Sequence, residues 1–158
     1  MNYKAFRKVV VLATAATVAF SGALAYAADK ASAKEAEAMV KKGVAFVKAN
    51  GKDKGYAEIT NRQGQFVDRD LYLIALQTDG KMLANGYNEK LVGMNRMESK
   101  GVDGKFAIRE MIEAAKAKNG TWTEYMYTDP LTKKPHDKAM YCEHLEESIL
   151  VCGGVYKS

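Results

Sequence analysis

Two cysteines and the histidines near them form the most chemically distinctive stretch of the sequence. Cys142 and Cys152 are the only cysteines among the 158 residues, and His144 follows Cys142 two positions later. Together with His136 they are ligand types that zinc or copper accepts. Three uses of the pair are therefore open: a metal site, a redox-active dithiol or a structural disulfide.

The spacing of these residues is not typical of a metal or redox motif. They follow the pattern H-x5-C-x-H-x7-C, which differs from the familiar C-x2-C with H-x3-H of zinc sites. No C-x-x-C stands at the start of a helix, the arrangement that lowers a thiol pKa. The haem attachment sequence C-x-x-C-H is also absent. A metal- or haem-binding protein therefore stays a minor alternative.

The N-terminus predicts export. Residues 1–8 contain three basic residues and no acid, and an apolar stretch of small residues then ends in Ala-Tyr-Ala at 25–27. These are the three parts of a secretory signal peptide, so we expect cleavage after Ala27 and a periplasmic or secreted location. The strongly apolar part is short for a membrane span, which usually needs about 20 apolar residues.

Removal of the signal peptide changes the charge of the chain. The whole sequence carries 24 basic and 19 acidic residues. Three basic residues leave with residues 1–27, so 21 remain against 19 acids, a net charge of +2. This balance gives little support to nucleic-acid binding. No later segment is apolar enough to span a bilayer, and we expect residues 28–158 to form one soluble domain.

An exported location favours a disulfide between the two cysteines. The stretches "KAMYCEH" and "SILVCGGVY" resemble strands, and residues 145–147 join them, which predicts an antiparallel hairpin. With Glu147 at the centre of the turn, Cys142 and Cys152 lie directly opposite each other. Opposed residues have Cα atoms about 4.5 to 5.5 Å apart, near the range that a disulfide accepts. The sequence therefore predicts a Cys142–Cys152 disulfide.

Three helices are expected along the chain. The sequence Ser-Ala-Lys-Glu at 32–35 has the form of a capping box, and apolar residues follow at helical spacing as far as Asn50. This predicts a long amphipathic helix in the N-terminal segment 28–50. A shorter helical turn is expected over 53–60, and a clear helical pattern covers 106–118.

The remaining patterns predict strands. Asp79-Gly80 is a tight hairpin signal between two strand-like stretches, and three more strands follow the last helix. The expected strands cover 70–77, 81–86, 121–128, 138–144 and 148–156. The order indicates an α+β fold, with one five-stranded antiparallel sheet, a long N-terminal helix and a second helix packed on it.

Several side chains in the sequence could bind a small carboxylate. Such a ligand needs a cation or several N–H or O–H donors in a partly dry pocket. The sequence offers the cations Arg109 and Lys138 and the hydroxyls of Tyr72, Tyr125, Tyr127 and Tyr141. Tyr125 and Tyr127 share one face of their strand, whereas Trp122 has the opposite parity. Ordinary structural roles compete with each of these: a solvent-facing Arg109, core tyrosines and a core Trp122.

No pattern in the sequence predicts an enzyme. There is no G-x-S-x-G nucleophile elbow, no glycine-rich phosphate loop and no H-E-x-x-H. The acids Glu143, Glu146 and Glu147 surround a hairpin tip, where side chains are usually solvated. We therefore expect a protein without catalytic activity and without a cofactor.

Five stretches of the sequence occur in an order typical of one family: "GQFVDRDLYLIALQTDGKMLANGYNEKLVGMN", "DGKFAIREMIEAAK", "GTWTEYMYTDP", "KAMYC" and "LVCGGVYK". They hold a strand–Asp-Gly–strand unit, an N-x-x-L-V-G loop, a D-G-K helix start and a final G-x-Y-K. On these motifs, over roughly residues 64–157, the chain resembles the single Cache family of extracytoplasmic sensor domains, type 2.

The resemblance implies a PAS-like antiparallel sheet over 64–157 with a pocket that commonly takes a small organic acid. Members are usually the outer sensor domains of chemoreceptors and histidine kinases. Lys138 and Tyr141 match the family's K-x-x-Y element, and Asn85 ends its second strand, so these positions are expected near the ligand. Asn85-Gly86 stands where the family often has His-Pro. No second membrane helix or output domain is present, so we expect a stand-alone exported member.

Two functional hypotheses follow. The first is a domain that binds a small metabolite non-covalently, for sensing through a membrane sensor or transporter partner. Its expected ligand-binding residues are Tyr125, Tyr141, Lys138, Arg109, Trp122 and Asn85. The second is a ligand-free interaction module, in which the apolar stripe of the N-terminal helix pairs with its copy in a homodimer.

Overall fold

The N-terminal half begins with two consecutive helices. The computed structural model describes residues 30–157, so the predicted signal peptide and its cleavage site after Ala27 lie outside the described residues. Helix α1 spans Ala33–Asn50 and α2 spans Lys52–Thr60. The predicted capping box is present, because the Glu35 N–H donates to the Ser32 hydroxyl at 3.3 Å and the Ser32 N–H donates to the Glu35 carboxylate at 2.7 Å. No helix within 30–157 is long and apolar enough to cross a membrane.

The predicted α+β fold is confirmed, with an antiparallel sheet of six strands. The strands are β1 (Val67–Asp68), β2 (Leu71–Gln77), β3 (Met82–Asn85), β4 (Thr121–Thr128), β5 (Pro135–Glu146) and β6 (Ile149–Tyr156). They follow the order β1-β2-β6-β5-β4, and β3 also pairs with β2. The sequence predicts five strands, and the additional one is β1. Two residues are too short to produce an alternating pattern, which explains the difference.

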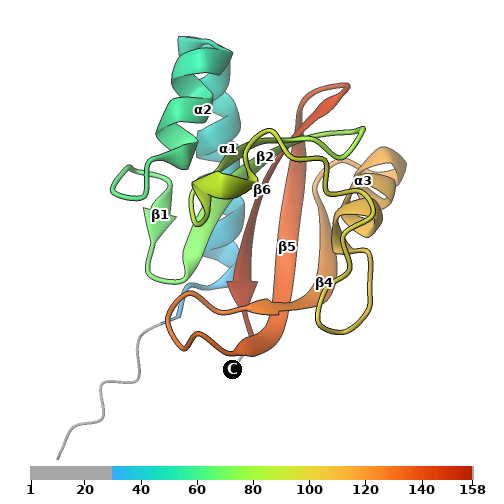
Figure 1. The fold of residues 1–158 in the computed structure, drawn as a ribbon. Coiled ribbons are helices and arrows are strands. Elements are labelled where there is room, and N and C mark those ends of the chain that lie inside the picture. The colour runs from blue at the N-terminus through green and yellow to red at the C-terminus, as the bar shows by residue number, and fades with distance from the viewer. Residues whose placement is uncertain (1–29, 158) are drawn as a thin grey trace, which may run out of the picture.

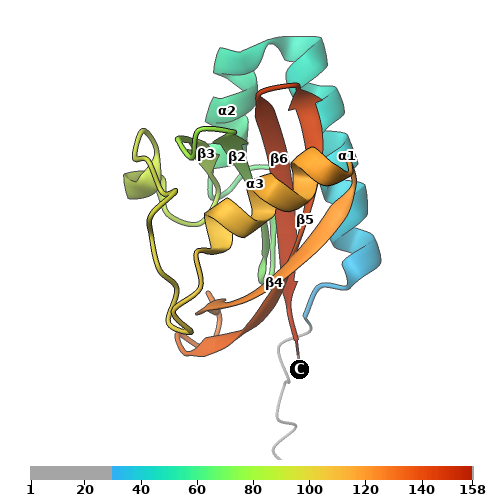
Figure 2. The same ribbon diagram turned by 90° about the vertical axis from the view of Figure 1, so that its right-hand side faces the viewer.

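The sheet carries helices on both faces (Figures 1 and 2). Helix α1 packs on β5 and β6 from one side, and α3 (Ala107–Ala117) crosses the other side. Gly43 allows the close approach of α1, because a Cβ atom there would lie 2.5 Å from Cδ1 of Leu73. The apolar stripe of α1, which includes Val40, Val44 and Val47, is buried on the sheet. This stripe is therefore occupied within the monomer and is not free to pair with a second copy.

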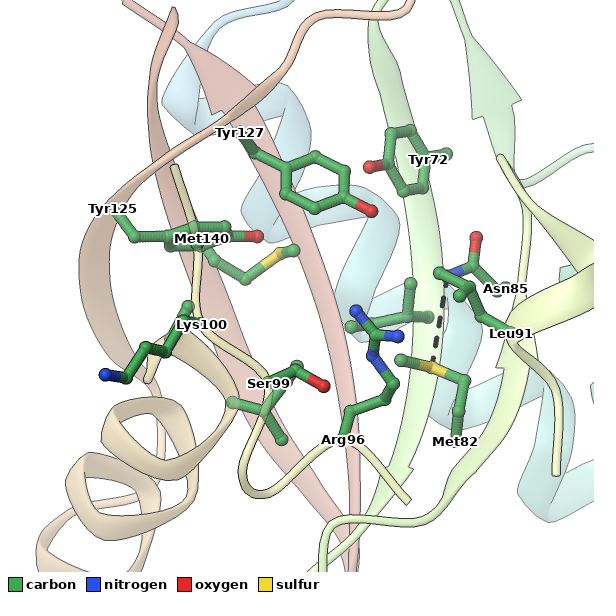
Figure 3. Close-up of a pocket in the computed structure, with 14 residues that line it drawn as sticks. Tyr72, Met82, Asn85, Leu91, Arg96, Ser99, Lys100, Tyr125, Tyr127 and Met140 are labelled. Carbon is green, nitrogen blue, oxygen red and sulfur yellow. Dashed lines mark hydrogen bonds between the residues drawn. The ribbon is translucent and has the colours of Figure 1, made fainter. Parts of the chain in front are cut away.

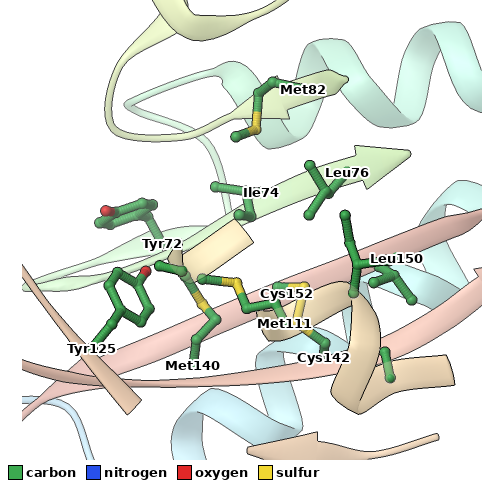
Figure 4. Close-up of a cluster of buried hydrophobic side chains, with 13 residues drawn as sticks. Tyr72, Ile74, Leu76, Met82, Met111, Tyr125, Met140, Cys142, Leu150 and Cys152 are labelled. Atoms are coloured by element: carbon green, nitrogen blue, oxygen red, sulfur yellow. A yellow bond between two sulfur atoms is a disulfide. The ribbon is translucent and has the colours of Figure 1, made fainter. Parts of the chain in front are cut away.

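The predicted disulfide joins the neighbouring strands β5 and β6. Cys142 and Cys152 are directly opposed in the β5–β6 pair, with Cα atoms 4.1 Å apart, and their sulfur atoms are bonded. Both are buried in the hydrophobic cluster under α3 (Figure 4). His144 lies nearby but contacts backbone, since its Nε2 is 3.1 Å from the carbonyl oxygen of Ala115. Among the described residues, no group of three or more metal-ligating side chains gathers.

A long connection follows the short helix η1 (Glu89–Leu91) and runs across the α3 side of the sheet. Its first part is tied to β3, because the Met82 N–H donates to the carbonyl of Met94 at 2.9 Å and the Gly93 N–H donates to that of Met82 at 2.8 Å. Its last part reaches β4, where the Lys105 ammonium donates to the carbonyl of Glu124 at 3.4 Å. Residues 92–106 therefore form a strap that spans from β3 to β4.

Candidate functional site

A cavity of about 60 Å³ lies between the α3 side of the sheet and this strap (Figure 3). One water molecule needs about 10 to 15 Å³ of such volume, so the cavity accepts a guest of roughly four to six non-hydrogen atoms. The strands supply Tyr72, Ile74, Met82, Asn85, Tyr125, Tyr127 and Met140, and the rest of the wall comes from Leu91, Arg96, Ser99, Lys100, Gly101, Ala107 and Ile108.

Three tyrosines form one wall of the cavity. Tyr125 and Tyr127 come from the same face of β4, with ring centroids 6.0 Å apart, and Tyr72 comes from β2. Figure 3 shows the hydroxyls of Tyr72 and Tyr127 turned toward each other. Burial raises the pKa of all three phenols above the usual value, so each hydroxyl is a neutral donor at physiological pH.

Arg96 supplies a positive charge to this cavity. Its backbone N–H donates to the carbonyl of Gly80 at 2.8 Å, and the neighbouring Asn95 side chain donates to the carbonyl of Asp79 at 2.8 Å. These contacts fix the strap against the β2–β3 turn and direct the Arg96 guanidinium into the cavity, as Figure 3 shows. Arg96 forms no ion pair with a carboxylate anywhere within residues 30–157. The cation is half-buried and faces the cavity without a counter-ion from the described chain.

Lys138 is fully buried and contacts the tyrosine wall at Tyr72. Its ammonium is 3.9 Å from the ring centroid of Tyr72 and 4.5 Å from that of Tyr156, and it donates to the Tyr156 hydroxyl at 3.3 Å. Gly154 leaves room for the lysine stem, since a Cβ there would lie 3.0 Å from the Lys138 Cε. Burial lowers the pKa of Lys138 to about 7, although nearby acids oppose the shift.

Those acids are Asp70 and Asp129, which are both fully buried. The Ala31 N–H donates to one Asp70 oxygen at 2.8 Å, and the Leu131 N–H donates to one Asp129 oxygen at 2.7 Å. The second oxygen of each carboxylate accepts no hydrogen bond from the described residues, although the Lys30 ammonium lies 3.8 Å from that of Asp129 as an ion pair. The buried Lys138 ammonium and the two carboxylates thus lie between the tyrosine wall and the start of α1, and the half-buried Lys30 adds a second cation at Asp129.

Two of the residues expected at the ligand line the cavity. Tyr125 is one, and Asn85 is the other. The Asn85 side-chain oxygen accepts from the N–H groups of Tyr87 at 3.0 Å and Asn88 at 2.8 Å, so this amide also shapes the turn after β3. Lys138, a third residue expected near the ligand, contacts Tyr72 of the cavity wall but does not line the cavity itself.

Tyr141 and Trp122, which are also expected near the ligand, do not line this cavity. They are paired neighbours on β5 and β4, with ring centroids 5.3 Å apart, and they belong to the cluster under α1. The Trp122 indole N–H donates to Glu37 of α1 at 3.3 Å, and the Tyr141 hydroxyl donates to Glu143 at 2.7 Å. Strand alternation places them on the face opposite Tyr125, Lys138 and the cavity.

Arg109 also lies away from the cavity. It forms an ion pair with Glu98, its guanidinium is 4.6 Å from the ring centroid of Phe106, and its side chain is 38% exposed. This is the solvent-facing role that competes with ligand binding in the sequence. Arg96, which does face the cavity, is not among the expected ligand-binding residues, because nothing in the periodicity of the strap indicates where its side chains point. The remaining signal is weak: Arg96 follows shortly after the N-x-x-L-V-G loop.

A sequence model of the single Cache domain 2 family matches residues 12–157. The chain belongs to this family. This confirms the resemblance, and single Cache domains are extracytoplasmic sensor domains. No curated protein is significantly similar to the chain.

Solved structures of sensor domains share the fold. A methyl-accepting chemotaxis protein from Vibrio parahaemolyticus is 24% identical, with a TM-score of 0.66, over 78% of this chain and 86% of that one. A Cache chemosensory domain described for carboxylic acid recognition is 19% identical, with a TM-score of 0.67, over 79% and 92%. A periplasmic sensor domain of a chemotaxis protein is 17% identical, with a TM-score of 0.61, over 79% and 90%.

Proposed function

We propose that this single Cache domain binds a short organic acid in the cavity under the strap. The observation that carries the proposal is the Arg96 guanidinium, which is directed into a half-buried cavity and has no carboxylate partner within 30–157. A cation in such a place gains most from a guest that brings its own negative charge.

The neighbouring groups suit the carboxylate of such a guest. Tyr125 and Tyr127 present neutral hydroxyl donors, and a hydrogen bond to a charged group contributes about 1.5 to 3 kcal/mol. Arg96 offers two parallel N–H donors to one carboxylate. The ligand head group would therefore lie between Arg96 and the tyrosine wall.

The rest of the cavity suits a small apolar tail. Ile74, Leu91 and Met140 contribute apolar surface to the lining. The volume of about 60 Å³ favours a short chain over a large metabolite. A monocarboxylate of two to about four carbons fits both the charge and the size.

Lys138 is proposed to favour anion binding through its charge, without touching the ligand. Lys138 does not line the cavity, but its ammonium lies 3.9 Å from the ring centroid of Tyr72, which does. In a medium of low dielectric constant its charge would still attract an anion in the cavity. The carboxylic acid named for the similar Cache chemosensory domain supports the same class of ligand.

Sensing would take place outside the cytoplasm and through a partner. The predicted signal peptide at 1–27 supports export to the periplasm or beyond. The chemotaxis proteins with the same fold support a role in which the occupied domain changes the state of a membrane sensor or transporter. The charged group formed by Lys138, Asp70 and Asp129 connects the cavity wall to Ala31, directly before α1.

A thermal-shift screen of the exported protein tests the proposal. The panel holds monocarboxylates of two to six carbons, dicarboxylates, amino acids and the matching uncharged amides. A ligand present at 100 times its dissociation constant raises the free energy of unfolding by about 2.7 kcal/mol. The short monocarboxylates are expected to stabilise the protein, and their amides are not. Equal effects of acid and amide, or none from any acid, would contradict the proposal.

A further inference from the structure

An open cleft on the outer surface carries charges that the cavity does not use. Four residues line it, namely Arg62, Tyr87, Asn88 and Lys133, and its volume is about 260 Å³. None of the four lines the cavity. They come from three separate segments: the turn after α2, the loop after β3 and the connection between β4 and β5. The fold therefore brings two cations and one aromatic ring together from distant parts of the chain.

The two cations flank one ring and lack counter-ions. The guanidinium carbon of Arg62 is 5.8 Å from the ring centroid of Tyr87, and the Lys133 ammonium is 5.7 Å from the same centroid. Neither cation forms an ion pair with a carboxylate of the described residues. Two like charges gathered around one ring repel each other, and a bound anion would relieve that repulsion.

The three segments are held in place by polar side chains at their turns. Asn61 accepts from the N–H of Gln63 at 3.1 Å and so closes the turn that contains Arg62. The Asn85 side chain closes the turn of Tyr87 and Asn88 through the two hydrogen bonds that it accepts there. Asp129 closes the third turn, and its carbonyl accepts from the Lys133 N–H at 2.9 Å. Such turns reduce the ordering cost of binding, because the backbone is already fixed.

The chemistry of the lining points to a phosphate group. Arginine and phosphate match in a two-pronged geometry, lysine adds a point charge, and the Asn88 amide adds a neutral donor. A phosphate carries about 1.5 to 2 negative charges at neutral pH, close to the charge of the two cations. Apart from the Tyr87 ring, the lining holds no apolar side chain that could select a carbon skeleton.

We propose that Arg62, Lys133, Tyr87 and Asn88 form a second binding site, which takes inorganic phosphate or the phosphate group of a small ester. The site is separate from the organic-acid cavity and does not depend on it. The two are nevertheless neighbours, because the Tyr87 ring stacks on Tyr72 of the cavity wall with centroids 5.3 Å apart.

An NMR titration with inorganic phosphate tests the site. The amide signals of Arg62, Tyr87, Asn88 and Lys133 are followed in the wild-type protein, with potassium chloride of equal ionic strength as the reference. Saturable shifts confined to these residues are expected. The double variant Arg62→Gln with Lys133→Gln is expected to weaken phosphate binding about ten-fold or more.

The matched control removes the same charge elsewhere. Lys41→Gln with Lys116→Gln changes two exposed lysines on α1 and α3 and is expected to keep the phosphate affinity. Equal losses in both double variants would show a bulk charge effect and overturn the site, as would shifts that do not saturate. The short monocarboxylates of the screen are titrated into the same wild-type sample, so failure of phosphate binding and failure of organic-acid binding are recognised separately.

Discussion

The ammonium of Lys138 lies 3.9 Å from the centre of the Tyr72 ring, and this contact joins the buried charges of the domain to its cavity. Asp70 and Asp129 also lie near the Lys138 ammonium, and their negative charges favour its protonated form. A cation held by aromatic faces retains part of its interaction energy without a directly paired carboxylate. Burial nevertheless outweighs these contacts and lowers the pKa of Lys138 to about 7.

The lowered pKa of Lys138 predicts how the stability of the protein depends on pH. Burial lowers the pKa of Lys138 to about 7 in the folded protein, against 10.5 ordinarily. Between these values the unfolded chain binds one more proton than the folded chain, so the Lys138 contribution to stability rises with pH. Each pH unit in the window changes it by up to about 1.4 kcal/mol.

The variant Lys138→Met is expected to remove this pH dependence. Urea unfolding at several pH values between about 7.5 and 9.5 measures it, and the slope of unfolding free energy against pH is compared between the two proteins. The comparison uses the slope, because loss of the cation near Asp70 and Asp129 also changes the absolute stability. Identical slopes for wild type and variant would show that Lys138 does not titrate in this range.

We expect carboxylate binding to depend on tyrosine hydroxyls of the cavity face of the sheet and not on those of the other face. Tyr125→Phe and Tyr127→Phe each remove a hydroxyl donor from the cavity and are expected to weaken carboxylate binding about ten-fold. Tyr141→Phe is the matched control, because its hydroxyl bonds Glu143 on the opposite face. Isothermal titration of all three variants measures the effect. Weakening by Tyr141→Phe as large as that of the other two would place the ligand elsewhere.

The disulfide is predicted to stabilise the α3-side core. The double variant Cys142→Ala with Cys152→Ala opens a short loop, for which the chain-entropy estimate is about 2 to 3 kcal/mol. Loss of two buried sulfur atoms adds to this cost. Denaturant unfolding of the variant measures the difference, with reduced wild-type protein as the control. Free thiols in oxidised wild-type protein, detected by mass spectrometry, would contradict the disulfide.

Most of the fold can be predicted from local patterns. The capping box at Ser32 and Glu35 and the opposed cysteines depend on interactions between residues close in sequence, and both predictions are confirmed. The short strand β1 escapes prediction, because two residues carry no alternation. Strand parity alone also separates Tyr125 from Trp122, although parity does not say which of the two faces a cavity.

The site is harder to predict than the fold. Arg96 and Arg109 are both arginines near the start of α3, and only their tertiary surroundings distinguish them. Arg109 pairs with Glu98 at the surface, whereas contacts of Asn95 and Arg96 with the β2–β3 turn direct Arg96 inward. These are contacts between a strap and a turn about 16 residues away, and no periodic pattern encodes them.

The central claim is that Arg96 binds a carboxylate, and one isothermal titration experiment tests it most directly. The best monocarboxylate of the screen is titrated into wild type, Arg96→Gln and Arg109→Gln under the same conditions. Each variant loses one positive charge, but only Arg96 lines the cavity. We predict an affinity about 100-fold lower for Arg96→Gln, from the loss of a two-pronged charged contact, and an unchanged affinity for Arg109→Gln. Wild-type affinity in Arg96→Gln would contradict the account.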